Sequence, residues 1–111
     1  MLKWEPMILP SSITFTKQAE INAAVSEVVR LQMPDVVHIR FDFGEDWSGD
    51  PAIFFRVLLS DEAAGRRLHN VTRRVVRALE EQVDFRSLGL FAYYNFRSVS
   101  EQAVLREEIW A

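Results

Sequence analysis

The sequence predicts an α+β fold, a two-layer sandwich with the element order α-β-β-α-β-α. Residues 17–33 and 61–83 carry apolar side chains at helical spacing, and residues 36–43, 52–59 and 90–97 have the alternation or the apolar content of strands. Two amphipathic helices and three short strands bury their apolar surfaces when both helices cover one face of a sheet. We therefore expect a small, mostly antiparallel sheet with helices on one face.

The length indicates one domain over residues 1–111. With 111 residues, 49% of them hydrophobic, the chain can bury an ordinary core and does not have the composition of a disordered chain. Pro6 and Pro10 disfavour helix in the residues before them, so residues 1–16 should form an extended N-terminal arm. Residues 98–111 should form a C-terminal tail or a short helix.

The first predicted helix begins after Thr16, which can cap it, and ends before Pro34 and Asp35. Its apolar stripe should face the sheet. The stripe consists of Ile21, Ala24, Val25, Val28 and Leu31.

The first two strands are joined by a short acidic loop, which favours an antiparallel hairpin. Strict alternation in residues 36–43 indicates a half-buried strand, and residues 52–59 are more uniformly apolar. One face of the first strand should carry Val37, Ile39, Phe41 and Phe43, and the other His38, Arg40 and Asp42.

A long helix over residues 61–83 follows Ser60, a suitable N-cap. After the third strand, Ser98 and Glu101 have the spacing of a capping box for a last short helix. The buried stripe of the long helix should be Ala64, Leu68, Val71, Val75, Val76, Leu79 and Val83.

Charge and composition exclude several classes of function. The net charge of −3 gives no overall attraction to nucleic acid or to an anionic membrane, and the absence of cysteine excludes thiol catalysis and cysteine-bound metal. No apolar run reaches the length of a membrane helix. We expect a cytoplasmic protein with no cofactor and no membrane partner.

The sheet face opposite the helices is the first candidate site, because it combines aromatic and arginine side chains. Its predicted interaction residues are Arg40, Phe54, Arg56, Tyr93 and Arg97, with Tyr94 and Phe96 replacing their neighbours if the register shifts. Tyr, Phe and Arg are enriched in protein interfaces, and the same residue types bind single-stranded nucleic acid. A third interpretation is that the N-terminal arm or the C-terminal tail covers this face.

The acidic loop is the second candidate site. Asp and Glu oxygens bind Ca²⁺ or Mg²⁺, but the spacing here does not match a regular calcium loop, and Gly44, Gly49 and Pro51 are typical of a plain turn. Trp47 is unusual in such a turn and could anchor a partner. The weak metal candidates are Asp42, Glu45, Asp46 and Asp50.

The long helix carries the third candidate site, a row of arginines on its solvent side. Arg66, Arg73 and Arg77 could contact phosphate groups, and the alternative is a solvated face neutralised by nearby acidic residues.

These observations favour a small non-enzymatic protein-interaction or oligomerisation domain, for example a homo-oligomer or an accessory or regulatory subunit of a complex. One alternative is a nucleic-acid-binding domain that uses the arginine-rich helix and the aromatic sheet face. The other is a metal-dependent enzyme at the acidic loop. His38 lies on a predicted strand, and the sequence shows no motif for a catalytic nucleophile beside it.

Overall fold

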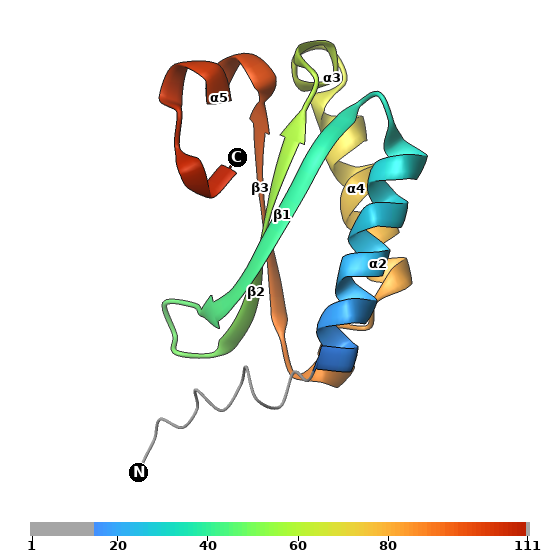
Figure 1. Cartoon of the computed structure of the whole chain (residues 1–111), viewed down its shortest axis with the longest axis vertical. Coiled ribbons are helices and arrows are strands. Elements are labelled where there is room, and N and C mark those ends of the chain that lie inside the picture. Colours follow the sequence, from blue (N-terminus) through green and yellow to red (C-terminus); the bar gives the residue numbers. More distant parts are fainter. Residues whose placement is uncertain (1–14, 111) are drawn as a thin grey trace.

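Three strands form one mixed sheet in the order β1-β2-β3. In this computed structural model, which describes residues 15–110, β1 (Val36–Glu45) pairs antiparallel with β2 (Pro51–Leu59), and β2 pairs parallel with β3 (Phe91–Ser98) (Figure 1). The predicted α+β class is confirmed. Among the strands of the described residues, β1 and β3 are the two edges of the sheet.

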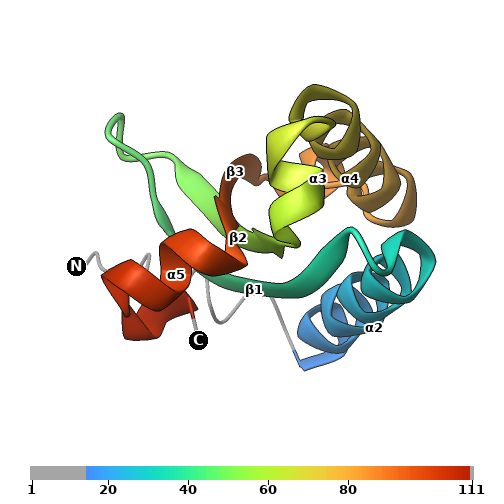
Figure 2. The ribbon, with the colours of Figure 1, turned by 90° about the horizontal axis from the view of Figure 1, so that it is seen from above.

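The helices make the second layer. Figure 2 shows α2 (Phe15–Gln32) and α4 (Leu68–Gln82) on one face of the sheet and α5 (Val99–Leu105) on the other. Parallel strands need a long crossover, and α3 (Asp61–Gly65), α4 and the short 3₁₀ helix η2 (Arg86–Leu88) supply it between β2 and β3. A second 3₁₀ helix, η3 (Glu108–Trp110), ends the described chain.

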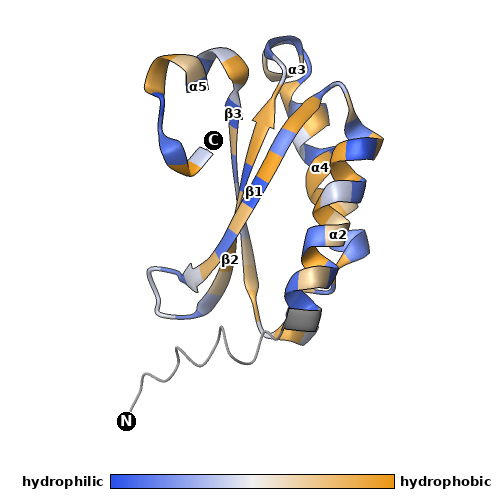
Figure 3. Cartoon of the chain, viewed as in Figure 1, coloured by the Kyte–Doolittle hydropathy of each residue, from blue (hydrophilic) through white to orange (hydrophobic). Residues whose placement is uncertain are grey.

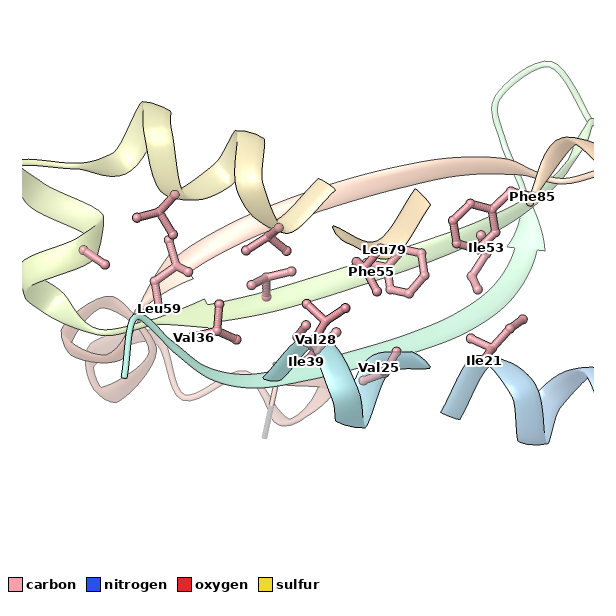
Figure 4. Packing of buried hydrophobic residues seen from close by; sticks show 14 of the residues in the cluster. Ile21, Val25, Val28, Val36, Ile39, Ile53, Phe55, Leu59, Leu79 and Phe85 are labelled. Atoms are coloured by element: carbon pink, nitrogen blue, oxygen red, sulfur yellow. The ribbon is translucent and has the colours of Figure 1, made fainter. Parts of the chain in front are cut away.

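The core lies between the sheet and the helices α2 and α4 (Figure 4). Phe55 on the central strand is fully buried and stacks on Tyr94 with ring centroids 5.3 Å apart. Its ring also contacts Phe85 edge-on at 5.6 Å and Phe41 at 5.9 Å. Rings in these tilted and offset arrangements stabilise a core beyond their buried area, by about 0.5–1.5 kcal/mol a pair.

The predicted stripe of the first helix is confirmed except at its end. Ile21, Ala24, Val25 and Val28 are buried against the sheet. Leu31 is exposed because it lies in the last turn of α2, where the chain is about to reverse into β1.

A β-bulge changes the predicted faces of β1. Val36 pairs with Leu59 but His38 pairs with Leu58, so one extra residue lies in β1 at Val37. Val36 is therefore buried and Val37 is exposed, which makes the prediction that Val37 faces the core wrong. From Ile39 onward the expected alternation holds, and Figure 3 shows hydrophobic and hydrophilic residues alternating along this strand.

The predicted single helix over residues 61–83 is also wrong, because it is two helices. The helix α3 ends after Gly65, a residue that weakens helices, and Arg67 leaves helical geometry with φ −118° and ψ 21° before α4 begins. Past this break Val71, Val75 and Leu79 are buried as expected, but α3 buries Ala63, and Leu68 is exposed.

The expected N-terminal arm lies largely outside the described residues, which begin at residue 15. Phe15 and Thr16 already belong to α2, so Thr16 does not precede the helix as its cap. None of the helices within residues 15–110 is long and apolar enough to cross a membrane.

Candidate interaction surface on the sheet face

The sheet face opposite α2 and α4 is built from rows of side chains that run across the three strands. Tyr93 and Arg97 belong to this face while Tyr94 and Phe96 pack against the core, so the unshifted register is confirmed. From the α5 end to the hairpin end, the rows are His38–Leu58–Arg97, Arg40–Arg56–Asn95, Asp42–Phe54–Tyr93 and Gly44–Ala52–Phe91.

The C-terminal segment covers one end of this face. The Arg97 guanidinium lies 4.3 Å from the centre of the Trp110 ring, donates to the Gln102 side chain at 2.9 Å and forms an ion pair with Glu107 at 2.9 Å. Only 16% of the Arg97 side chain is exposed. Arg97 was expected to contact a partner, but it holds the chain's own C-terminal segment in place, so coverage by the tail is correct for this end.

The capping box predicted for the last helix starts that segment. The Ser98 hydroxyl accepts from the backbone N–H of Glu101 at 3.0 Å, and the Glu101 carboxylate accepts from the N–H of Ser98 at 2.9 Å. These reciprocal bonds fix the direction in which α5 leaves β3 and returns over the face.

His38 lies in the row nearest to α5, beside Leu58 and Arg97. Its Nε2 atom is buried and makes no hydrogen bond within the described part of the chain. A buried polar atom without a partner is unfavourable for folding.

The hairpin end of the face is aromatic and open. Trp47 is 85% exposed, and its ring centre lies 5.6 Å from that of Tyr93. Tyr93 also stacks on Phe54, at 5.5 Å and an angle of 20°. Together with exposed Phe91 one row further on, these residues form the aromatic patch, which consists of Trp47, Phe54, Phe91 and Tyr93.

Gly44 makes room for the ring of Phe54 in this patch. A Cβ atom at Gly44 would lie only 3.3 Å from Cε2 of Phe54, a tight contact that the ring would have to avoid by shifting. The glycine expected to serve only the turn therefore also lets the Phe54 ring lie flat across β1.

Asp46 fixes the loop that carries Trp47. Its Oδ1 accepts from the backbone N–H groups of Ser48 at 2.9 Å and Asp50 at 3.0 Å, and its Oδ2 accepts from the Tyr93 hydroxyl at 2.7 Å. Gly49, with φ of 84°, takes the left-handed conformation that closes the turn. The Tyr93 hydroxyl first, and then these backbone groups, hold the pKa of Asp46 below its usual value.

The same hydrogen bond raises the pKa of Tyr93, because the Asp46 carboxylate opposes a second negative charge. Sequence patterns did not reveal this contact, since 47 residues separate its two partners. Only the parallel pairing of β2 with β3, which places Tyr93 beside Phe54, brings the two together.

The middle of the face is charged. Arg56 donates to the Asp42 carboxylate at 3.0 Å across β1 and β2, and 17% of its side chain is exposed. Arg40 sits beside Arg56 and is exposed. Of the five predicted interaction residues, Arg40, Phe54, Arg56 and Tyr93 thus lie together, and Arg97 lies under the C-terminal segment.

The carboxylates of the acidic loop do not converge on one point. Asp42 pairs with Arg56, both oxygens of Asp46 hold the loop, and Glu45 and Asp50 are exposed. Among residues 15–110, no group of three or more His, Asp and Glu side chains could hold a metal ion. The geometry therefore gives no support to a metal site at these residues.

The arginines of α3 and α4 divide into two sets. Asp35 accepts two hydrogen bonds from Arg67, at 2.7 and 3.0 Å, and one from Arg74 at 2.7 Å. Glu62 also pairs with Arg67. Arg73 and Arg77, in contrast, form no ion pair or side-chain hydrogen bond within the described chain, and with Asn70 and Arg74 they line a shallow depression of about 370 Å³.

Arg66, the third residue of the predicted row, lies in the break between α3 and α4. Arg67 first, and Arg66 more weakly, lower the pKa of Glu62. The predicted row of arginines along one straight helix therefore keeps only Arg73 and Arg77. Arg66 lies outside this row, at the break between α3 and α4.

Comparisons of the chain with protein-family models, with curated proteins and with solved structures found no match.

Proposed function

We propose that this chain is a non-enzymatic protein-interaction domain of the cytoplasm, an accessory or regulatory subunit whose docking surface is the aromatic patch. The single observation that carries this proposal is Trp47. Its side chain is 85% exposed, yet Asp46 and Tyr93 fix the loop beneath it. An indole that is 85% exposed buries little of its apolar surface within the chain, so a loop built to hold it there has its use in contact with another molecule.

The surroundings of Trp47 support the same proposal. Aromatic rings packed side by side form the apolar centre of the surface, and Arg40, Arg56 and Asp42 provide a polar border. This is the usual anatomy of a protein interface, in which a few aromatic and arginine anchors carry most of the binding energy.

Replacing Trp47 with Ala should abolish capture of the partner. The tagged protein would be isolated from cells of its own organism under native conditions, and the proteins retained would be quantified for the wild type and for Trp47→Ala. A partner anchored by this indole should be lost from the variant, because truncating an interface anchor weakens binding by about 2 kcal/mol or more, roughly 30-fold in Kd.

The matched control is Val104→Ala. Val104 is 80% exposed on α5, away from the hairpin loop, so its truncation removes exposed apolar surface elsewhere on the molecule. The control should retain the partner. Equal retention by the wild type and by Trp47→Ala would contradict the proposal.

A second candidate function is binding of a single-stranded nucleic acid or another polyanion by α4. The observation that favours it is the absence of ion-pair partners for Arg73 and Arg77 within the described residues, which leaves their guanidinium groups available to phosphate. The overall charge of −3 acts against such binding.

A further inference from the structure

The outer edge of β1 is unpaired in the described structure, because β1 pairs with β2 alone. An edge strand presents a row of backbone N–H and C=O groups that another strand can pair with. A groove of about 760 Å³ runs along this edge, between α2 and residues 37–43 of β1. The edge therefore has both unpaired backbone groups and space beside them.

The chemistry of the groove limits what can occupy it. The helix side is lined by Gln18, Asn22, Val25, Ser26 and Val29, none of which is charged. The strand side contributes one residue of each charge, Arg40 and Asp42, both on the open sheet face. A fitting occupant is a strand with uncharged residues toward α2 and with a positive and a negative residue on the opposite face.

The strand β1 itself has this pattern. Ile39, Phe41 and Phe43 face the helices, and Arg40 and Asp42 face away from them. We propose that the occupant is β1 of a second copy of this chain, paired antiparallel across a two-fold axis at Phe41. The two sheets then join into one continuous sheet.

Among the registers that keep the two sheet faces aligned, only an axis at Phe41 places Arg40 opposite the partner's Asp42. With Phe41 on the axis, Arg40 lies opposite the partner's Asp42, and the same pair occurs twice. An axis at Arg40 would place two arginines opposite each other, and an axis at Asp42 would place two carboxylates opposite each other. Opposite charges across a strand pair stabilise it and like charges destabilise it.

This inference deepens the proposed function. It rests on that proposal only for the premise that the domain works by binding other protein chains. A two-fold axis perpendicular to the sheet leaves both aromatic patches on the same side of the dimer, so a partner would meet two docking surfaces. The two proposals fail separately. Loss of the partner in Trp47→Ala tests the patch, and the variants below test the edge of β1.

Single cysteines test the register, since the chain has no cysteine of its own. Paired residues on antiparallel strands have Cα atoms about 4.5–5.5 Å apart, which a disulfide spans. Phe41→Cys should form a covalent dimer on mild oxidation. Phe43→Cys, the matched control, should not, because its copies would lie four residues apart along the pair, about 13 Å.

Charge reversal tests the same interface without touching the core. Arg40→Asp and Asp42→Arg should each be monomeric in sedimentation velocity, because each places like charges opposite one another. Mixed in equal amounts, the two variants should associate, since every pair across that heterodimer is then of opposite charge. Circular dichroism would first show that both variants are folded.

The outcomes decide the proposal. A wild-type dimer, a cross-link at position 41 alone and rescue on mixing would establish it. A wild-type monomer at all concentrations, a cross-link at position 43, or single charge variants that still dimerise would overturn it. If Asp42→Arg fails to fold after losing its pairing with Arg56, the cysteine variants still give the answer.

Discussion

The Tyr93 hydroxyl donates a hydrogen bond of 2.7 Å to Oδ2 of Asp46, and so ties the edge strand β3 to the turn between β1 and β2. The other oxygen of the same carboxylate holds the backbone of the turn. One side chain therefore orders the loop internally and attaches it to the sheet. Trp47 follows Asp46 directly, so its position depends on this contact.

Removing the hydroxyl should loosen the loop while leaving the sheet intact. In Tyr93→Phe, the backbone amides of Ser48 and Asp50 should exchange with solvent faster, because the carboxylate that accepts from them is no longer anchored. Hydrogen exchange followed by NMR measures this directly. Partner capture should weaken in the same variant.

Tyr94→Phe is the matched control for that measurement. The Tyr94 hydroxyl donates to Glu80 at 3.3 Å on the helix side of the sheet, and burial raises its pKa. Its removal should leave Ser48 and Asp50 unchanged. Equal acceleration of exchange in both variants would show that the loop responds to any loss of stability and that the Asp46 contact has no specific role.

The loop should also open at low pH. The pKa of Asp46 is lowered in the folded protein, so its stabilising contacts are fully present above the unfolded value, about 3.9, and are lost as the pH falls through the lower folded value. An NMR titration of the Ser48 amide should therefore show its transition below about pH 3.9. In Tyr93→Phe the transition should move upward, since the largest cause of the shift is absent. A transition of the Ser48 amide above the ordinary pKa range of an aspartate would contradict its assignment to Asp46.

Asp35 connects the start of β1 to the crossover helices. Its side chain is only 13% exposed, and it accepts from Arg67 and Arg74. Asp35→Asn should lower the free energy of unfolding by about 1–2 kcal/mol, because hydrogen bonds to charged groups are lost and two guanidinium groups keep one neutral acceptor. Urea unfolding measures the change. Glu20→Gln, which removes an exposed carboxylate on α2, should have little effect.

The pH dependence of this contribution has the same sign as that of Asp46. Arg67 is the main cause that lowers the pKa of Asp35, so the contribution is present above the unfolded value and is lost as the pH falls below it. The stability difference between the wild type and Asp35→Asn should therefore shrink toward strongly acidic pH. If the stability difference between the wild type and Asp35→Asn did not change with pH, the effect of the substitution would be due to packing and not to the charge of Asp35.

Replacing His38 should stabilise the protein. Its buried Nε2 atom has no hydrogen-bond partner within residues 15–110, and removing an unsatisfied polar atom recovers a desolvation penalty of about 1–3 kcal/mol. His38→Leu should raise the free energy of unfolding by about 1 kcal/mol. A loss of stability would show that the imidazole has a packing or water-mediated role on this face.

Periodicity predicted the elements because it reports burial. Ile39 and Phe41 on β1, or Val71 and Val75 on α4, alternate with exposed residues at the period of a strand or a helix, and the structure packs them in the core as expected, with Phe41 partly buried. Two of the exceptions are at Val37 and Arg67, where the backbone departs from the regular period. A bulge and a helix break each shift the phase of the pattern without changing its composition.

The sequence could predict which residues belong to the candidate site, but not which of them contact one another. Alternation placed Phe54 and Tyr93 on one face once the strands were assigned. It could not show that Asp46 accepts from Tyr93 or that Asp35 binds Arg67 and Arg74, because these pairs depend on how distant segments are arranged in space. Nor could it show that the C-terminal segment returns to cover Arg97.

The second candidate function makes a quantitative prediction about salt. If α4 binds single-stranded nucleic acid through Arg73 and Arg77, log K should fall linearly with log salt concentration, with a slope of about −0.7 per phosphate neutralised. The double variant Arg73→Ala/Arg77→Ala should bind more weakly and with a slope smaller in magnitude by about 1.4. Fluorescence anisotropy of a labelled single-stranded oligonucleotide over a series of salt concentrations measures both.

The control for this prediction is a double variant with the same net charge as Arg73→Ala/Arg77→Ala. Arg30→Ala/Arg86→Ala also removes two positive charges, but from α2 and from η2, outside the depression that Arg73 and Arg77 line. Its slope should equal that of the wild type. If both double variants lose the same affinity, then only overall charge matters and α4 provides no binding face. If the wild type does not bind at low salt, the polyanion function is excluded.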